Sequence, residues 1–217
     1  MRYITATIGL TVLFYFMANG QTIFNVDIYY EALCPDSQFF VKEQLVRSYP
    51  DLKKHLHINF IPYGKAEHKK VDSTWHFSCQ HGPAECRGNK AQACAINEIK
   101  NLGLKLQDEQ QLLVDLVGCA MTSQNPEISV PSCALKIGLK EDLKNRIVIC
   151  KGNSQGDELL SEYGRISNNF QNPISFVPSI VINGSSQYQN MAFRKFKELI
   201  CSLIPSNERP ASCKVVN

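Results

Sequence analysis

Apolar side chains open the chain in a strand period and then change to a helical one. From Thr22 to Tyr30 most positions are apolar, β-branched or aromatic, which predicts a buried strand. Cys34-Pro35 follows, and proline is favoured at the first helical position because its missing N–H is not needed there. Val41, Leu45 and Tyr49 then recur every four residues, so they share one face of a predicted helix.

A second strand completes this opening unit. Pro50 disfavours α geometry at Tyr49, so we expect the helix to end there. His57 to Tyr63 is again rich in apolar and β-branched residues, which predicts a strand. The chain therefore opens strand–helix–strand, with Cys34 at the turn from the first strand into the helix.

Residues 65–150 follow a different pattern. They hold six cysteines and three helical stretches: one around Ala95 to Leu102, one from Leu112 to Met121, and a less regular one between Cys133 and Cys150. We interpret the segment as a helical insertion tied by disulfides. No change of composition separates it from its flanks, so we expect one domain over residues 21–217.

The last third returns to the opening pattern. A helix face is predicted from Leu159 to Phe170, then a strand over Ile174 to Ile182 that Val177-Pro178 interrupts. Asn183-Gly184 predicts a hairpin turn, because both residues tolerate positive φ, and a short strand to Tyr188 should follow. A closing helix is expected from Phe193 to Leu203, bounded by Pro205.

The first 20 residues resemble a cleaved secretory signal. A basic residue precedes an apolar run from about Ile4 to Ala18, and small residues follow at Ala18 and Gly20. The alternative is an uncleaved anchor, but the run is shorter than the roughly 20 apolar residues that span a bilayer. Charges interrupt every later apolar run, so we expect no membrane anchor after signal cleavage.

The charge balance excludes two classes of partner. The chain has 23 lysines and arginines against 20 aspartates and glutamates, a net charge of +3. This small excess gives no reason to expect nucleic acid or an anionic lipid surface as a partner.

Nine cysteines in a secretory chain predict disulfides and one unpaired thiol. Cys34 is the position best suited to be the free one; its pairing with another cysteine is the alternative. Eight cysteines allow 105 pairings, so the connectivity stays open. The expected structural disulfide cysteines are Cys79, Cys86, Cys94, Cys119, Cys133, Cys150, Cys201 and Cys213.

Cys34 opens the tetrapeptide Cys34-Pro35-Asp36-Ser37, in which a serine stands where dithiol enzymes carry their second cysteine. A helix N-terminus stabilises the reactive thiolate, whereas the charge of Asp36 opposes it. Ser37 can hydrogen-bond a thiolate, but it cannot resolve a mixed disulfide. Either an external thiol completes the reaction, or the protein forms adducts without turnover.

Pro178 is the second candidate site residue. In thioredoxin-like folds a cis-proline at the start of a strand packs beside the active-site sulfur, and X–Pro is the context in which a cis bond is most accessible. The alternative is an edge-strand proline, and the sequence leaves the isomer open.

Three segments together resemble one family. Cys79-Gln80-His81-Gly82-Pro83-Ala84-Glu85-Cys86, with Asn89 and Cys94 after it, is similar to the signature of gamma-interferon-inducible lysosomal thiol reductases. The segments from Tyr29 to Pro35 and from Phe176 to Gly184 resemble the family's active-site and proline strands. The resemblance covers essentially the whole chain after the signal.

The resemblance implies an α/β, thioredoxin-like fold with a helical insertion, and reduction of protein disulfides in an acidic endosomal or lysosomal lumen, or after secretion. The family's nucleophile corresponds to Cys34 and its resolving cysteine to Ser37. We expect no cofactor beyond an external reducing thiol as co-substrate, and disulfide-containing proteins as substrates. The alternatives are a redox-inactive or adduct-forming binding protein, and an inert secreted scaffold with Cys34 buried.

Two further motifs keep two interpretations each. His81, with His76 and His68 nearby, could suggest zinc, but in an oxidising lumen we interpret His81 as a local hydrogen-bonding residue without a catalytic role. Asn183-Gly184-Ser185 is an N-glycosylation sequon, although turn chemistry alone explains its Asn-Gly pair.

Overall fold

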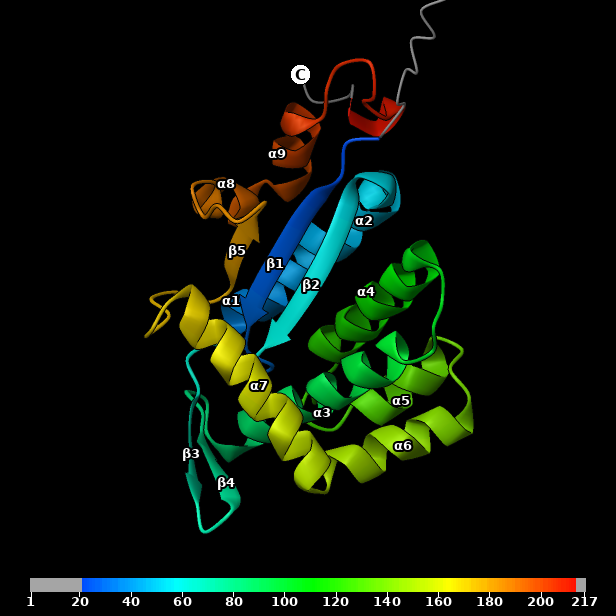
Figure 1. Ribbon diagram of the computed structural model, residues 1–217. Helices are drawn as coiled ribbons and strands as arrows, with labels where there is room; N and C mark the ends of the chain where they lie inside the picture. The colour runs from blue at the N-terminus through cyan, green and yellow to red at the C-terminus, as the bar shows by residue number, and fades with distance from the viewer. Residues whose placement is uncertain (1–20, 214–217) are drawn as a thin grey trace, which may run out of the picture.

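The computed structural model describes residues 21–213 (Figure 1). The predicted signal segment, residues 1–20, lies outside this range. Within the described range, no helix combines the length and apolar character that crossing a membrane requires.

A three-stranded sheet of order β2-β1-β5 forms the centre of the fold. β1 pairs in parallel with β2 and antiparallel with β5. Val26, Ile28 and Tyr30 of β1 are fully buried, whereas Asn25 is exposed and Asp27 is partly exposed, so the first half of the strand alternates. The strands are β1 Phe24–Tyr30, β2 Leu56–Pro62 and β5 Ser179–Ile182.

The connection from β1 to β2 is helical, so the predicted strand–helix–strand opening is confirmed. Its predicted face is confirmed as well, because Val41, Leu45 and Tyr49 are buried in the main core. The segments are α1 Pro35–Phe39, the π-helical η1 Phe40–Leu45, α2 Val46–Leu52 and the 3₁₀ turn η2 Lys53–His55.

The predicted helix end at Pro50 is wrong. Pro50 lies inside α2, which runs on to Leu52. The π-helical η1 directly precedes α2, so the backbone hydrogen bonds before Pro50 depart from the regular α pattern. Burial of Tyr49 and Leu52 on either side holds this turn in place.

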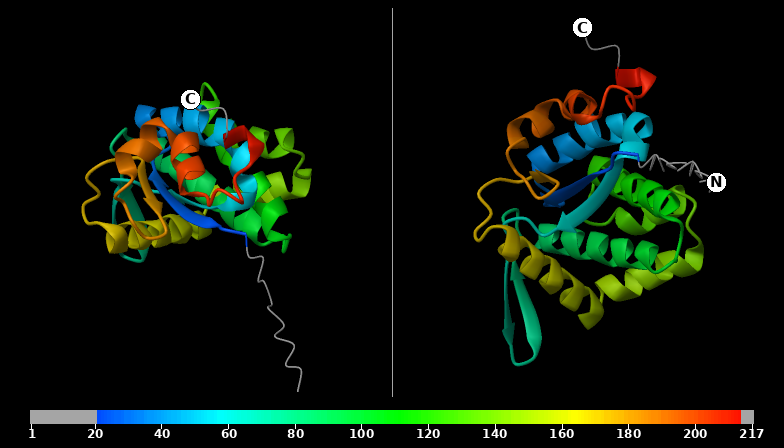
Figure 2. Two further views of the ribbon diagram at one scale, coloured as in Figure 1. Left: turned by 90° about the horizontal axis from the view of Figure 1, so that it is seen from above. Right: turned by 45° about the horizontal axis from the view of Figure 1, so that its top comes forward.

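The insertion is helical, as predicted, but it begins with a hairpin that the sequence did not suggest. β3 Glu67–Val71 and β4 Thr74–Ser78 pair antiparallel and project from the body of the molecule (Figures 1 and 2). The predicted irregular helix between Cys133 and Cys150 is two helices. The helices are α3 Pro83–Lys100, α4 Leu106–Thr122, α5 Val130–Lys136 and α6 Glu141–Lys151.

Four disulfides use the eight expected cysteines. Three of them lie within the insertion, and the fourth fastens the C-terminal segment to α9. The longest loop is closed by Cys94–Cys150, which joins α3 to α6. The others are Cys79–Cys86, Cys119–Cys133 and Cys201–Cys213.

The C-terminal third differs from its prediction in three places. The strand predicted over Ile174 to Ile182 is shorter, because β5 begins only after Pro178, at Ser179. The predicted strand after Asn183-Gly184 is reduced to one bridge between Ile182 and Ser185, although both turn residues have positive φ as expected. The single closing helix is split at Lys195. The helices are α7 Ser154–Phe170, α8 Gln189–Arg194, α9 Phe196–Leu203 and the 3₁₀ turn η3 Ala211–Cys213.

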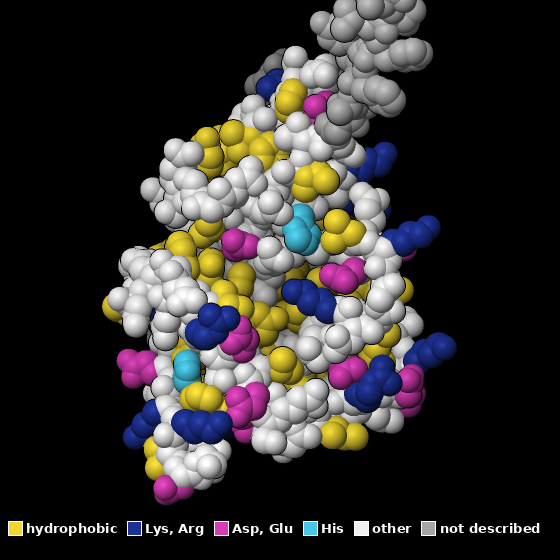
Figure 3. All heavy atoms as spheres, viewed as in Figure 1, with side chains coloured by type: hydrophobic (Ala, Val, Ile, Leu, Met, Phe, Trp, Pro, Cys, Tyr) yellow, Lys and Arg dark blue, Asp and Glu magenta, His cyan; other side chains and the backbone are white. Residues whose placement is uncertain are grey.

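The helices of the insertion lie along the β2 side of the sheet, where α3, α4 and α7 all contact β2, whereas α8 contacts β5 on the other side (Figure 1). On the face drawn in Figure 3, acidic and basic side chains are interspersed, in keeping with the small net charge. A parallel β–α–β unit followed by an antiparallel strand entered through a proline is an α/β, thioredoxin-like arrangement, here with a disulfide-tied helical insertion.

Candidate functional site

Cys34 stands at the carboxyl end of the central strand, at the N-cap of α1. Its backbone is extended and Pro35 occupies the first helical position, so the predicted strand-to-helix turn is confirmed. Among the described cysteines, Cys34 alone carries a free thiol. Local sequence is enough to build this turn, because a strand ends and a proline starts a helix within five residues.

The thiol is less exposed than the sequence suggested. Cys34 is 6% exposed, but it lines a surface pocket of about 300 Å³. A buried thiol at the edge of a pocket can be reached by an extended segment that enters the pocket. The remaining lining residues are Pro35, Asp36, Lys65, Gln80, His81, Phe176 and Val177.

The proline strand meets the thiol as the resemblance implied. The Val177-Pro178 peptide bond is cis, and the Cys34 Sγ lies 3.8 Å from the carbonyl oxygen of Val177, close enough to donate a weak hydrogen bond. Phe176 forms the next part of the pocket wall, and its ring packs edge-on against Phe193. Cys34 and Pro178 therefore belong to one site, although most of the chain separates them.

Ser37 does not line that pocket. It is fully buried, and its Oγ accepts a weak hydrogen bond from the backbone N–H of Glu31 at 3.4 Å. No hydrogen bond joins it to Cys34 in the described part of the chain. Ser37 thus fastens the start of the helix to the end of β1.

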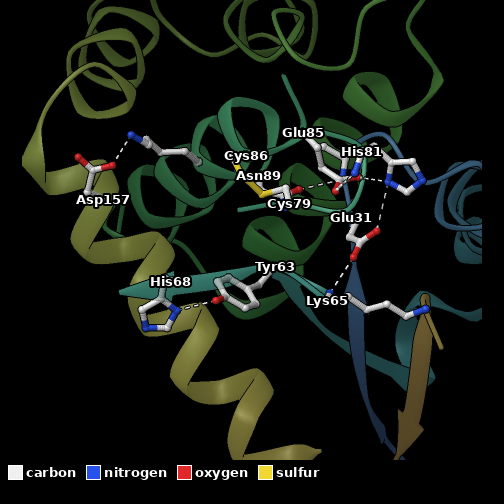
Figure 4. Close-up of a disulfide and its surroundings, with 12 residues drawn as sticks. Glu31, Tyr63, Lys65, His68, Cys79, His81, Glu85, Cys86, Asn89 and Asp157 are labelled. Carbon is white, nitrogen blue, oxygen red and sulfur yellow. Dashed lines mark hydrogen bonds and ion pairs between the residues drawn. A yellow bond between two sulfur atoms is a disulfide. The ribbon is translucent and has the colours of Figure 1, made fainter. Parts of the chain in front are cut away.

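A buried cluster of two carboxylates and one imidazole underlies the pocket (Figure 4). His81 Nδ1 lies 2.6 Å from Glu85 Oε2 and 3.4 Å from Glu31 Oε2. Both glutamates are fully buried, whereas the His81 side chain is 31% exposed. His81 is the hydrogen-bonding residue that the sequence predicted, but its partners are two residues to which the sequence analysis gave no role.

Each carboxylate of this cluster is also held by the backbone. The N–H of Lys65 donates to Glu31 Oε1 at 2.7 Å, and the N–H of His81 donates to Glu85 Oε1 at 3.1 Å. The free oxygen of each carboxylate then faces the imidazole. Glu31 Oε2 has no hydrogen-bond partner among the described residues.

Burial raises the pKa of Glu31 to about 7. Removal from water disfavours the charged carboxylate, and the nearby carboxylate of Glu85 adds to the rise. The hydrogen bond from Lys65 N–H and the charges of His81 and Lys65 act in the opposite direction. Glu31 is therefore mostly protonated in a mildly acidic compartment.

The rest of the signature segment fastens the active-site turn to α3. The N–H of Ala32 donates to Asn89 Oδ1 at 2.8 Å, and the Tyr30 hydroxyl donates to Gln92 Oε1 at 2.6 Å. Gly88 allows close approach, since a Cβ there would lie 2.8 Å from the Ala32 methyl group. This part of the signature segment therefore acts as a scaffold, because α3 carries the groups that hold Tyr30 and Ala32 just before Cys34.

The three histidines of the zinc alternative do not share one cluster. His68 pairs with the Tyr63 hydroxyl at 2.5 Å, and His76 is exposed on β4. In the part of the chain that the structure describes, the set that could hold a metal ion is Glu31, His81 and Glu85, whose ligand atoms lie within 4.8 Å of one another. His81 Nδ1 and Glu85 Oε2 of this set already lie within hydrogen-bonding distance of each other, at 2.6 Å.

The sequon asparagine lies away from the pocket. Asn183 is exposed in the turn after β5, and its Oδ1 accepts a hydrogen bond from the N–H of Asn25 at 2.9 Å. The side chain thus has a structural role at the far end of the sheet. Glycan attachment at Asn183 stays a prediction.

Comparisons with known proteins support the family resemblance that the sequence motifs indicated. The family model described as gamma interferon inducible lysosomal thiol reductase (GILT) matches residues 25–137. A "Gamma-interferon-inducible lysosomal thiol reductase-like protein" from Anopheles gambiae is 31% identical over 198 residues, which cover 89% of this chain and 81% of the relative. A "Gamma-interferon-inducible lysosomal thiol reductase" from Carassius auratus is 30% identical, over 87% of this chain and 71% of the relative.

Proposed function

Because the chain belongs to the family of gamma-interferon-inducible lysosomal thiol reductases, we propose that it reduces protein disulfides with Cys34 as the nucleophile. The observation that carries this proposal is the placement of a free thiol at the N-terminus of a helix, on a pocket that Val177 completes. The thiolate is the species of a cysteine that reacts with disulfides.

The first step is attack on a substrate disulfide. The Cys34 thiolate forms a bond to one substrate sulfur, the substrate S–S bond breaks, and the other substrate sulfur leaves with the electron pair. The substrate is then half reduced and joined to Cys34 in a mixed disulfide. The pocket that Cys34, Phe176 and Val177 line is where we expect a substrate segment to lie beside the sulfur.

The second step needs a thiol from outside the chain. Ser37 cannot attack the mixed disulfide, and the other eight cysteines are paired. A small external thiol therefore attacks the mixed disulfide and releases the reduced substrate, and a second such thiol returns Cys34 to its free form. The small thiol is the co-substrate, and no bound cofactor takes part.

The proposed place of action is an acidic lumen of the secretory or endosomal system, or the exterior of the cell. Four disulfides suit an oxidising route of export, and the buried Glu31 is protonated most readily in acid. The names of the relatives from Carassius auratus and Mus musculus include the word lysosomal.

The test is a disulfide-reduction assay at mildly acidic pH with excess small thiol. Wild-type protein should reduce a denatured disulfide-containing protein, and Cys34→Ser should lose that activity while retaining the wild-type melting temperature. Equal rates for the two proteins would reject the proposal.

A second candidate is a binding protein that captures partners without turnover. Two observations favour it: Ser37 replaces the resolving cysteine, and Cys34 is largely buried. This candidate expects Cys34→Ser to bind extended peptides as well as wild type, with no reductase activity in either protein. Thiol labelling of the native protein identifies an inert scaffold, since a scaffold with an inaccessible Cys34 would remain unmodified.

A further inference from the structure

The two ring nitrogens of His81 have different surroundings: Nδ1 contacts the carboxylates, and Nε2 does not. Nδ1 faces Glu85 Oε2 and Glu31 Oε2, and in Figure 4 the other ring nitrogen points away from both carboxylates. Within the described residues, Nε2 makes no hydrogen bond, and His81 lines the same pocket as Cys34. The partly exposed side chain therefore offers Nε2 to whatever occupies that pocket.

The carboxylates determine which nitrogen exchanges a proton. A carboxylate at 2.6 Å from Nδ1 keeps the Nδ1–H in place as a donor, so Nε2 is the atom that gains or loses a proton. His81 N–H donation to Glu85 Oε1 fixes the orientation of that carboxylate in turn. The cluster thus holds the ring in one tautomer and one direction.

We propose that His81 Nε2 gives a proton to the substrate sulfur that leaves when Cys34 breaks the disulfide. The same atom then takes a proton from the external thiol that attacks the mixed disulfide. This inference rests on the proposed function, in which the chain has no second thiol of its own. Every exchange step at Cys34 must then move a proton to or from a sulfur that belongs to another molecule.

The proton balance closes over the cycle. In the first step the substrate S–S bond breaks, its leaving sulfur keeps the electron pair and accepts the Nε2 proton, and His81 becomes neutral. In the second step the incoming thiol gives its proton to Nε2, its sulfur bonds to the Cys34 sulfur, and the second substrate sulfur leaves with the electron pair and takes that proton. In the third step another thiol gives its proton to Nε2 and its sulfur bonds to the small-thiol sulfur attached to Cys34. Cys34 leaves as the thiolate, so both Cys34 and the protonated His81 are restored. An alkyl thiol with a pKa near 8.5 is almost fully protonated in acid, so a base beside Cys34 is needed for each thiol attack.

Other charged groups of the pocket suit these two tasks less well. Lys65 lines the pocket too, but a lysine ammonium ordinarily keeps its proton at acidic pH and cannot accept one from the incoming thiol. Asp36 is exposed at the first turn of α1, where a negative charge opposes formation of a thiolate. An imidazole is the side chain that can do both in mildly acidic surroundings.

The experiment compares three single-step reactions of Cys34, followed by intact mass at mildly acidic pH. Iodoacetamide needs only the thiolate. An aromatic disulfide releases a thiol that is already ionised at that pH. An alkyl disulfide, such as a cystine-containing peptide, releases a thiol that must be protonated. A group that protonates the leaving sulfur affects only the last reaction.

His81→Gln should slow the reaction with the alkyl disulfide by roughly 100-fold, the usual lower range for general acid catalysis, and leave the other two rates little changed. These two rates also report that the variant is folded with a normal thiol. His76→Gln is the matched control, because this histidine is exposed on β4, and it should leave all three rates unchanged.

Two results would overturn the inference. One is an unchanged alkyl-disulfide rate in His81→Gln; the other is an equal loss in all three reactions, which would assign His81 a structural role or an effect on the thiolate. Failure of the proposed function looks different: wild-type protein would be alkylated by iodoacetamide but would react with neither disulfide, and the proton-transfer role would fall with it.

Discussion

The Oε2 atom of Glu31 lies 3.4 Å from the imidazole Nδ1 of His81, although Glu31 directly follows β1 and His81 lies in the loop before α3. Three residues after Glu31 comes the reactive Cys34, and His81 lines the pocket of that thiol. This contact joins the central strand to the family signature, so it links the stability of the fold to the state of the site.

Glu31 should make the protein more stable in acid than at neutral pH. Its pKa of about 7 in the folded protein exceeds the ordinary 4.5, so the folded state binds more protons between these values and stability falls as the pH rises through them. The full difference amounts to about 3 kcal/mol as an upper estimate. Urea unfolding of wild type and Glu31→Gln from about pH 4.5 to 8 measures it.

The Gln variant should lose most of this slope, because its amide does not titrate. Glu67→Gln, at an exposed position on β3, is the control and should keep the wild-type slope. A wild-type protein whose stability rises from pH 5 to pH 7 would contradict the assignment of Glu31 as the dominant titrating group.

Gly64 and Gly103 form a matched pair for testing the cluster. Both have φ near +60°, so alanine at either position is strained by about 1–2 kcal/mol. At Gly103 a Cβ would meet open space, but at Gly64 it would lie 2.3 Å from the Glu31 Cγ. Gly64→Ala should therefore be less stable than Gly103→Ala by about 1–3 kcal/mol, as for an overpacked core.

The same pair separates strain from function. Denaturant unfolding gives the stability difference, and alkylation of Cys34 in the folded proteins reports the active-site turn. Gly103→Ala should retain the wild-type alkylation rate, while displacement of Glu31 in Gly64→Ala should change it. Equal stability of the two variants would mean that the Glu31 side chain can move away from the added methyl group of Gly64→Ala without a loss of free energy of unfolding.

The disulfides should differ in their contribution to stability. Cys94 and Cys150 are 56 residues apart and fully buried, whereas Cys201 and Cys213 are 12 apart. Loss of loop entropy in the unfolded chain predicts a destabilisation of about 4 kcal/mol for the first pair and about 3 kcal/mol for the second when each is replaced by alanines.

Replacement of Cys94 and Cys150 should destabilise the protein somewhat more than this, because two alanines leave empty space in the core. Thermal and denaturant unfolding of the two double variants measure the difference. If removal of Cys201–Cys213 destabilised the protein more, loop entropy and burial would not explain how much each disulfide contributes to stability.

Ser37→Cys should reduce the dependence of turnover on added thiol. A thiol one turn after Cys34 can attack the mixed disulfide and release the substrate, which a hydroxyl cannot do. Reductase rates of wild type and variant at low and high concentrations of small thiol provide the measurement. The gain should be largest at low thiol, where resolution is slowest.

Ser37→Ala is the control for this change. It removes the hydrogen bond with the Glu31 N–H, at a cost of about 1 kcal/mol in stability, and it should leave the thiol dependence as in wild type. The same thiol dependence in Ser37→Cys and wild type would show that resolution does not limit turnover.

Local patterns were enough to predict the strand β1, the turn at Cys34 and the buried face of Val41, Leu45 and Tyr49. Each of these depends on residues a few positions apart, where period and proline chemistry act directly. The hairpin β3–β4 was not predicted because most of its residues are exposed, and because Asp72 and Ser73 take the positive φ angles of its turn without a glycine.

The cluster of Glu31, His81 and Glu85 is beyond such patterns. The resemblance pointed to His81 and Glu85 within one signature, but Glu31, which follows β1, is brought to them only by the packing of the insertion against the sheet. Likewise, the burial of Ser37 and its contact with the Glu31 N–H depend on how the turn packs, which the tetrapeptide alone does not determine. The sequence was therefore enough to identify Cys34, whereas the residues around it could be identified only from the tertiary structure.

The disulfide Cys79–Cys86 closes the short loop that carries His81, and Cys79 is partly exposed to solvent. The loop that forms one wall of the pocket is thus held by a disulfide, the same type of bond that the protein is proposed to reduce. Any reductant that regenerates Cys34 also threatens this bond. The range of useful thiol strengths therefore has an upper limit, beyond which the protein would dismantle its own site.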